Sequence, residues 1–409
     1  MDVKSRLMAK FAIGIAVTAV GFPALYGNVA AAQDMTPTPT VLQLRQSYLD
    51  QPFSSLTFRS MDKFYWTRTV PHAAPKWPIP RNDHKLDFTY SFEGKTYAPD
   101  EFLERTFTNA LIVIKDGRIV YETYRNGATE NDRFMGFSMT KSITSILIGK
   151  LVEQGRIRSI DDPVTDYLPE LKTGGYNGVP IRNILQMRSG AYRNETYTPK
   201  DPESQPPGSP MAALRDNVSR YVDAAPTIAT VRKPGEKFFY LNLDTAVLGL
   251  LVERLSGNTI AGFTAQHLWE PMGAEADSFF VLDGAPGVGR EFNVAGFNAT
   301  ARDWARVGLL MLNDGKAGGR QVVSPAWVAA STKPIPTGEP SEQGYGYQWW
   351  TTPDNAAFMA QGHLGQFVYV NRKAKTVIVK LSYFPAVDAK QLGKESHAFF
   401  AAAAAWNPK

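Results

Sequence analysis

The chain has 409 residues, of which 44% are hydrophobic, 20% charged and 12% aromatic, enough for a large core in one big domain or two lobes. Residues 1–32 hold Lys4, Arg6 and Lys10 against Asp2, which leaves 41 basic and 38 acidic residues in the remainder. That balance, without a basic run interleaved with aromatics, argues against a nucleic-acid partner. The absence of cysteine excludes disulfides, thiolate metal sites, a lipidated cysteine and a cysteine nucleophile.

The N-terminus predicts a secretory signal peptide. Three basic residues precede Phe11–Tyr26, which is uncharged and mostly apolar, and the small-residue stretch "NVAAAQD" suits cleavage after Ala31 or Ala32. The alternative is an uncleaved membrane anchor, since residues 11–33 are uncharged throughout, but Pro23 weakens it. We therefore expect export to the periplasm or beyond, with membrane contact only through residues 1–32.

Strand patterns begin after an irregular N-terminal extension, residues 33–104, which is rich in proline, threonine and aromatics. In "NALIVIKDGRIVYETYRNG", two β-branched runs flank Lys115-Asp116-Gly117, which predicts a hairpin. The following "SMTKSITSILIGKLVEQG" has the apolar spacing of a helix that ends at Gly155.

Helical patterns dominate a lobe of about residues 157–330, and strand patterns return from Gly344 before a last helix. The chain is therefore predicted to be α+β: an antiparallel sheet built from both ends of residues 105–405, flanked by helices, with a mostly helical lobe inserted. The loop Gly190–Pro210 contains five prolines, and loops of that length are often functional.

Ser138 and Lys141, in "GFSMTKS", form the first candidate pair. On a helix, residues three apart share a face, and a serine at the N-terminus sits where free N–H groups favour developing negative charge. The alternative is an N-cap serine with a solvated first-turn lysine. A second Ser-x-x-Lys, Ser60 and Lys63, is followed by a sequence that does not predict a helix.

Two further patterns are weaker taken alone. Of five Tyr-x-Asn occurrences, Tyr240 and Asn242 lie in an extended segment, where both side chains point the same way; Tyr192 is the competing tyrosine. In "GHLGQF", His363 and Gly365 are predicted to share one face of a strand, although an ordinary hydrogen-bonded histidine would look the same.

Together these patterns resemble the serine β-lactamase-like hydrolases, which include class C β-lactamases, DD-peptidases, related esterases and 6-aminohexanoate-dimer hydrolases. Tyr240 follows Ser138 by 102 residues, and His363 follows Tyr240 by 123. The similarity covers roughly residues 105–405 and includes "IDDPVTDYLPEL" and "RDWARVGLLMLNDG". The stretch "HLGQFVYVNRKAKTVIVKLSYFP" looks most like the aminohexanoate-dimer branch.

The resemblance implies roles for individual residues. Ser138 would be the nucleophile, Lys141 and Tyr240 its proton-transfer network, and Asn242 a partner of Lys141 or the substrate. The N–H groups of Ser138 and Gln366 would form the oxyanion hole. Whether the lysine or the tyrosine is the general base stays open.

His363 stands where the related lactamases have a lysine. A largely neutral histidine would bind a carboxylate less well, so strong β-lactamase activity is not expected. "GFSMT" also lacks the second glycine of Gly-x-Ser-x-Gly, which argues against an α/β-hydrolase.

The predicted function is an exported serine hydrolase that cleaves short amides, esters or peptides through an acyl-enzyme, without metal or other cofactor. Additional substrate contacts are predicted at Tyr192 and Tyr197, in the proline-rich loop, and at Asn293. The alternatives are a DD-peptidase or β-lactamase acting on cell-wall peptides or β-lactams, and a non-catalytic peptidoglycan-binding module.

Overall fold

The computed structural model describes residues 36–195, 208–338 and 343–408. The predicted signal segment and Tyr197 lie outside these ranges. Residues from Pro37 onward form one compact unit, so the N-terminal extension from Pro37 packs with the rest. Within the described ranges no helix combines the length and apolar character needed to cross a membrane.

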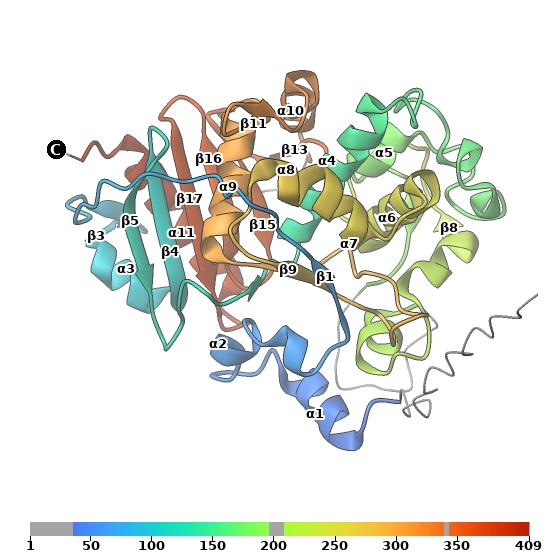
Figure 1. The fold of residues 1–409 in the computed structure, drawn as a ribbon, viewed down its shortest axis with the longest axis horizontal. Coiled ribbons are helices and arrows are strands. Elements are labelled where there is room, and N and C mark those ends of the chain that lie inside the picture. The colour runs from blue at the N-terminus through green and yellow to red at the C-terminus, as the bar shows by residue number, and fades with distance from the viewer. Residues whose placement is uncertain (1–35, 196–207, 339–342, 409) are drawn as a thin grey trace, which may run out of the picture. The chain divides into compact units, whose positions relative to one another are not determined.

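A seven-stranded antiparallel sheet joins the two ends of the unit, as predicted (Figure 1). In spatial order its strands are β13 (Gly344–Tyr345), β14 (Trp350–Thr351), β15 (Ala357–Gly362), β16 (Gln366–Asn371), β17 (Thr376–Ser382), β4 (Thr108–Lys115) and β5 (Arg118–Tyr124). The predicted hairpin is confirmed, since β4 and β5 are its two arms. The α+β architecture expected from the sequence is therefore confirmed.

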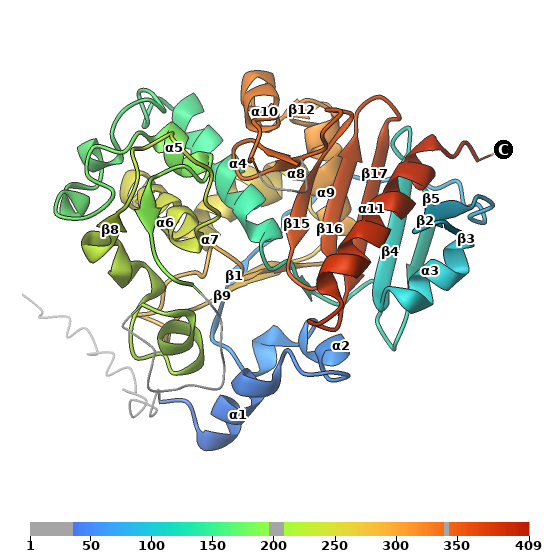
Figure 2. The same cartoon turned by 180° about the vertical axis from the view of Figure 1, so that it is seen from behind.

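Helices cover both faces of the sheet, which explains why β4, β16 and β17 are buried along their whole length. On one face, α9 (Ala301–Leu312) lies close to the strands at Gly308, where a side chain would meet Val377 at 2.5 Å. On the other face, Phe400 of α11 (Ala389–Ala405) packs against Phe367 at 5.3 Å between ring centres (Figure 2).

The middle of the chain is helical, but in shorter pieces than the apolar spacing suggested. The remaining α-helices are α1 (Pro39–Ser47), α2 (Ser54–Thr57), α3 (Pro99–Arg105), α4 (Met139–Glu153), α5 (Ile181–Leu185), α6 (Asn242–Ser256), α7 (Ile260–Thr264), α8 (Glu270–Met272) and α10 (Pro325–Ser331). Short 3₁₀ and π turns are η1 (Met61–Lys63), η2 (Val164–Asp166), η3 (Pro169–Leu171), η5 (Met211–Arg215), η6 (Tyr221–Thr227) and η7 (Ala265–Trp269).

A second sheet of four short strands was not predicted. Its order is β1 (Thr67–Val70), β9 (Ser278–Val281), β10 (Phe297–Ala299) and β6 (Phe134–Met135). Strands of two to four residues carry too little alternation to be seen in a sequence. The sheet matters for the site because β6 ends three residues before Ser138, and β1 links it to the N-terminal extension.

Two-stranded pairings complete the described secondary structure. They are β2 (Tyr90–Phe92) with β3 (Lys95–Tyr97), β7 (Ala191–Tyr192) with β8 (Ala229–Thr230), and β11 (Lys316–Ala317) with β12 (Arg320–Gln321).

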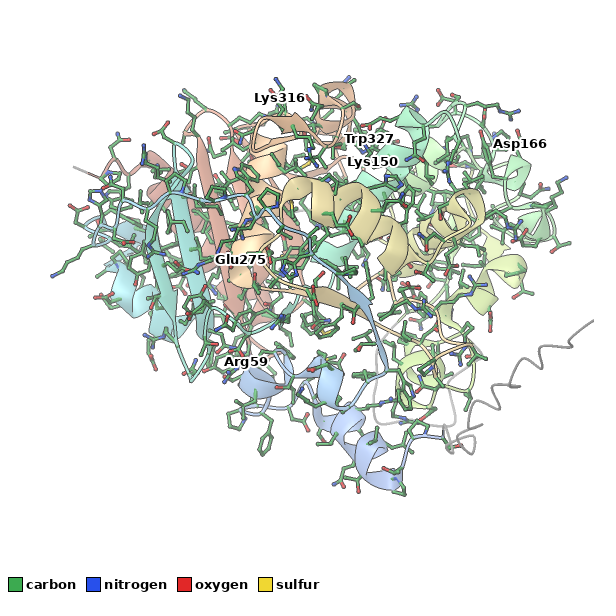
Figure 3. All side chains as sticks on the ribbon, viewed as in Figure 1. Arg59, Lys150, Asp166, Glu275, Lys316 and Trp327 are labelled. Atoms are coloured by element: carbon green, nitrogen blue, oxygen red, sulfur yellow. The ribbon has the colours of Figure 1, made fainter. Side chains whose placement is uncertain are left out.

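The helix α4 packs against α6 of the helical lobe and against β15 of the large sheet. Its face near Gly149 touches the indole of Trp327 on α10, and the neighbouring Lys150 donates to the carbonyl of Val322 at 2.7 Å (Figure 3). A Cβ at position 149 would lie 2.6 Å from the indole ring. Only glycine lets the two helices approach this closely.

We expect Gly149→Ala to lower the free energy of unfolding by about 1–3 kcal/mol, because a rigid ring must move to admit one methyl group. The matched control is Gly393→Ala in α11, where a Cβ meets nothing within 4 Å. That change should raise stability by about 0.5–1 kcal/mol through helix propensity. Urea unfolding measures both, and equal stability of the two variants would contradict the packing argument.

Candidate active site

The turn that carries Ser138 is held by backbone contacts on two sides. Gly136 donates its N–H to the carbonyl of Phe297 at 2.9 Å, and a Cβ at Gly136 would lie 2.4 Å from the indole of Trp304. Phe137 adopts a φ of 45°, a conformation that side chains rarely take, and its ring packs against Phe58 at 4.9 Å. Contacts on both sides therefore hold the turn in its strained conformation, which strained backbone at a functional site requires.

Lys141 lies one helical turn further, almost wholly buried at 1% exposure. Its Nζ is 3.0 Å from Oγ of Ser138 and donates to the carbonyl of Val294 at 2.8 Å. Burial lowers the pKa of Lys141 to about 7, against a smaller opposing effect of Glu195. A large fraction of the amine is therefore unprotonated near neutral pH and can accept a proton.

Tyr240 completes the group on the other side of Ser138. Its phenol lies near enough to the side chain of Ser138 to interact with it, and Nζ of Lys141 lies 5.1 Å from the centre of its ring. The ring stacks on Trp350 at 5.7 Å and 20°. Burial raises the pKa of Tyr240, the interaction with Ser138 offsetting this only in part. The phenol is therefore neutral at pH 7, which makes Lys141 the better proton acceptor of the two.

Gln366, the predicted oxyanion-hole residue, begins β16 beside the nucleophile turn. The last residue of β15, Gly362, pairs with Gln366 and sits so close to Gly136 that a Cβ would lie 2.2 Å from its carbonyl oxygen. The amide side chain of Gln366 donates to the carbonyl of Ser382 at 2.7 Å and accepts from its N–H at 3.2 Å. These contacts fix the position of Gln366, while its part in an oxyanion hole stays a prediction.

The predicted strand face of His363 and Gly365 is wrong. Both residues lie in the turn between β15 and β16, where Leu364 has a φ of 53° and Gly365 a φ of 94°. Hairpin turns need positive φ, and a side chain at 365 would meet Phe384 at 2.6 Å. His363 is exposed at its outer edge, while its ring lies 5.9 Å from that of Phe137. Crowding by protein lowers the pKa of His363, so it is neutral at pH 7.

A cavity of about 290 Å³ opens over Ser138. Its polar lining consists of Tyr48, Ser138, Glu195, Tyr240, Asn242 and His363, and its apolar lining of Leu49, Met135, Phe137, Pro210, Leu214, Phe292, Val294 and Ala295. A concave, mostly apolar site with a few converging polar groups is the usual form of a small-molecule site. Asn242, His363 and the proposed nucleophile thus face one space.

Glu195 was not predicted, and it is the only carboxylate among the described residues that line this cavity. It accepts hydrogen bonds from the N–H groups of Asn242 at 2.7 Å and Leu243 at 3.2 Å, and from the phenol of Tyr221 at 2.6 Å. The carboxylate therefore caps α6 and holds the segment that carries Tyr240. Because the cap comes from 47 residues upstream, no local pattern could have indicated it.

Asn293 is not a substrate contact, contrary to prediction. Its side chain is buried and donates to the carbonyl of Thr245 at 2.7 Å, and Gly249 of α6 lies against it. It braces α6 beside Val294, the acceptor of Lys141. Tyr192 is exposed on β7, its ring 5.3 Å from that of Phe239, and it does not line the cavity. Its role as a substrate contact stays a prediction.

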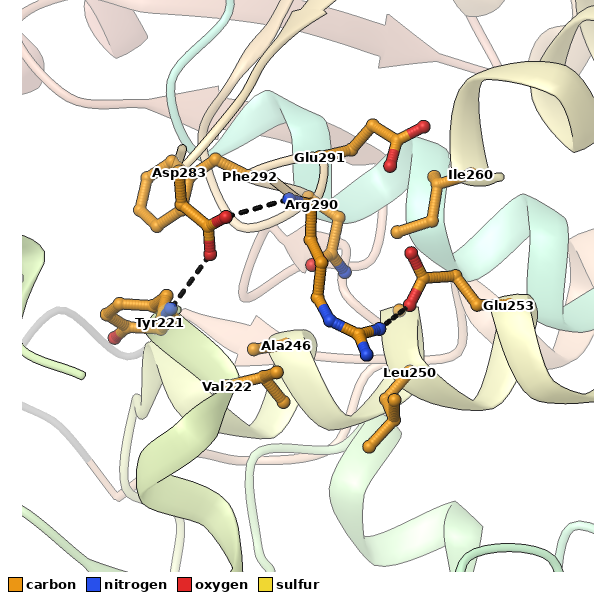
Figure 4. Close-up of a pocket in the computed structure, with 12 residues that line it drawn as sticks. Tyr221, Val222, Ala246, Leu250, Glu253, Ile260, Asp283, Arg290, Glu291 and Phe292 are labelled. Atoms are coloured by element: carbon orange, nitrogen blue, oxygen red, sulfur yellow. Dashed lines mark hydrogen bonds and ion pairs between the residues drawn. The ribbon is translucent and has the colours of Figure 1, made fainter. Parts of the chain in front are cut away.

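A second, smaller cavity shares Phe292 with the first in its lining (Figure 4). Asp283 accepts from the N–H groups of Tyr221 and Arg290, both at 2.8 Å, and the guanidinium of Arg290 pairs with Glu253. The volume of about 20 Å³ holds about one water molecule, which is too small for a substrate. Within the described ranges, no group of three or more His, Asp or Glu side chains is placed to hold a metal ion.

The β-lactamase family profile matches residues 101–391. The chain belongs to the β-lactamase family. It is 31% identical to a 6-aminohexanoate-dimer hydrolase of Paenarthrobacter ureafaciens over 388 residues, covering 90% of this chain and 93% of that protein. A solved structure from Bacillus anthracis, provisionally named a 6-aminohexanoate-dimer hydrolase, superposes with a TM-score of 0.75 at 25% identity, covering 87% of this chain and 95% of the other.

A more distant relative is a teichoic acid D-alanine hydrolase of Staphylococcus aureus, 22% identical over 58% of this chain and 56% of that protein. The family membership and the relatives together show that the chain is a serine hydrolase of the β-lactamase and transpeptidase type, as predicted.

The pH dependence of hydrolysis should report Lys141. Because the unprotonated amine is the competent form, kcat/KM for p-nitrophenyl acetate should rise with pH through a midpoint near 7. Glu195 raises the pKa of Lys141, so Glu195→Gln should move this midpoint to lower pH. The control, Glu130→Gln, changes an exposed carboxylate and should leave the midpoint in place. A rate independent of pH between 5 and 9 would contradict the assignment.

Proposed function

We propose that this protein hydrolyses short amide or ester bonds through an acyl-enzyme formed on Ser138. The observation that carries the proposal is the meeting of three side chains over one cavity: the hydroxyl of Ser138, the buried amine of Lys141 and the phenol of Tyr240. A serine hydroxyl is a weak nucleophile until a base takes its proton, and here the base lies 3.0 Å away.

In the acylation step, Oγ of Ser138 attacks the carbonyl carbon of the substrate while its proton moves to Nζ of Lys141. The tetrahedral intermediate then collapses, and the bond to the leaving amine or alkoxide breaks. The proton reaches the leaving group from the Lys141 ammonium through the phenol of Tyr240, which touches Ser138. In the second half, water attacks the ester carbon while Lys141 takes the water proton. The bond from that carbon to Oγ of Ser138 then breaks as Lys141 returns the proton to Oγ, which releases the acid product and restores Ser138.

Negative charge on the carbonyl oxygen would be met by the N–H groups of Ser138 and Gln366. The amide of Ser138 stands at the start of α4, where helix N–H groups have no acceptor within the helix. Each preorganised donor of this kind lowers such barriers by about 3–4 kcal/mol. The close packing of Gly362 on Gly136 is what would keep the two donors together.

The substrate that we propose is a linear amide of the 6-aminohexanoate-dimer type. The long relative and the Bacillus anthracis structure both carry that name. The cavity agrees with it, because its walls are mostly apolar and His363 is neutral where a β-lactam carboxylate would need a cation. Aminohexanoate dimers are therefore expected to be hydrolysed faster than nitrocefin or D-Ala-D-Ala peptides.

Ser138→Ala should abolish hydrolysis of aminohexanoate dimers and p-nitrophenyl esters while leaving the circular-dichroism spectrum unchanged. The matched control is Ser60→Ala at the second Ser-x-x-Lys, where Lys63 pairs with Asp62 at 2.7 Å rather than with the serine. A fluorophosphonate probe should label Ser138 alone, as mapped by mass spectrometry. Near-normal turnover by Ser138→Ala, or labelling elsewhere, would exclude the mechanism.

We also propose that the chain is exported and that its signal segment is removed. The support is the basic start, the uncharged apolar run and the small residues that precede Gln33. N-terminal sequencing of the protein from a periplasmic or medium fraction should find a chain that begins at Ala32 or Gln33. An intact Met1 in a membrane fraction would instead support the uncleaved anchor.

A further inference from the structure

Part of the cavity over Ser138 is built by the N-terminal extension, ahead of the residues that the β-lactamase family profile matches. Tyr48 and Leu49 follow α1 directly, and both line the cavity over Ser138. Pro210 and Leu214, at the η5 turn, line it as well. Two segments more than 160 positions apart in the chain thus supply neighbouring apolar walls of one site.

Arg45 joins these two segments. Its side chain is 3% exposed, and its Nε donates to the carbonyl of Phe64 at 2.7 Å, inside the N-terminal extension. Its Nη1 reaches the η5 side, with acceptors at the carbonyls of Leu214 at 3.2 Å and Arg215 at 3.0 Å, and at Oδ1 of Asn217 at 2.6 Å.

The guanidinium of Arg45 also lies 4.7 Å from the centre of the Tyr65 ring. A buried guanidinium is unfavourable unless its donors are satisfied, and here Nε and Nη1 find main-chain and amide oxygens as acceptors. The acceptors of Arg45 lie on both segments. All of its hydrogen bonds can therefore form together only when the two segments keep the relative position seen in the structure.

The short segment made of α1 and the two residues after it buries little apolar surface. In α1, Leu44 is 47% exposed, and Val41 and Leu42 are half-buried. The apolar residues that are withdrawn from water beside Ser138 are Tyr48, at 6% exposure, and the half-buried Leu49. The segment therefore directs its buried apolar surface at the cavity.

We propose that Tyr48, Leu49 and Leu214, held in register by Arg45, form a specificity wall that recognises an aliphatic chain on the acyl group transferred to Ser138. This rests on the proposed function, because the acyl group stays attached to Ser138 until water removes it. Tyr48, Leu49 and Leu214 are specificity-determining residues in this account, and Arg45 is a positioning residue that acts through them.

The test compares p-nitrophenyl acetate with p-nitrophenyl hexanoate, whose leaving group is the same. In the unmodified protein, each methylene added to the acyl chain of the ester should raise kcat/KM about fourfold, as long as that acyl chain packs against the apolar wall. Leu49→Ala, Tyr48→Ala and Arg45→Ala should each reduce the hexanoate-to-acetate ratio by about tenfold. The control is Leu44→Ala, an exposed position on α1, which should keep the original ratio.

If Arg45 only stabilises the fold, Arg45→Ala should lower kcat/KM for both esters by the same factor and leave their ratio unchanged. A changed ratio therefore indicates a positioning role. If Arg45→Ala does not fold, Leu49→Ala still tests the proposal, since the half-buried side chain of Leu49 makes none of the hydrogen bonds of Arg45. An unchanged ratio in both Leu49→Ala and Tyr48→Ala would overturn the proposal.

A binding measurement keeps this inference distinct from the catalytic mechanism. In Ser138→Ala, calorimetry should find that hexanamide binds more tightly than acetamide, and that Leu49→Ala removes the preference. If this binding preference is found but the unmodified protein hydrolyses none of the substrates, the result would contradict the proposed mechanism and support the specificity wall. Equal binding of the two amides would overturn the wall even if Ser138 is the nucleophile.

Discussion

A lysine amine buried against a serine hydroxyl is the constraint on which the rest of this structure depends. Water would keep the amine protonated; burial of Lys141 instead lowers its pKa to about 7, and the carbonyl of Val294 holds it in place. Desolvating a charged group is unfavourable, so the surroundings must be rigid enough to prevent the amine from turning back to solvent. Much of the helical lobe contributes to this rigidity around Lys141.

The rigidity comes from close contacts at glycines. Gly136 fits against Trp304, Gly362 fits against the carbonyl of Gly136, and Gly249 fits against Asn293, which precedes Val294. Each glycine lets one element approach another more closely than a side chain would allow. The nucleophile turn, the β15–β16 hairpin and α6 are thereby locked around one point, while Glu195 fixes the start of α6 through its N–H groups. The result is a preorganised site in which few groups need to move.

Prediction from sequence succeeded where the signal was local. The β4–β5 hairpin, the helix that follows Ser138 and the sheet built from both ends depend on apolar spacing and turn residues within short windows. Prediction failed where the surroundings of a residue are supplied by segments that are distant in the sequence. His363 looked like a strand residue because the positive φ of Leu364 leaves no mark in the sequence, and Asn293 was predicted to contact substrate although its amide is buried against α6.

The sequence by itself determined the fold class and pointed to the candidate reacting groups, since Ser-x-x-Lys on a helix and Tyr-x-Asn ahead of another indicate a chemistry by residue type and spacing. Only the tertiary structure decided which group can accept the proton, because a pKa depends on burial and on neighbours distant in the chain. It alone also placed Glu195 at the start of α6 and the N-terminal extension in the wall of the cavity. Those contacts join residues with no short-range relation, and packing rather than local pattern brings them together.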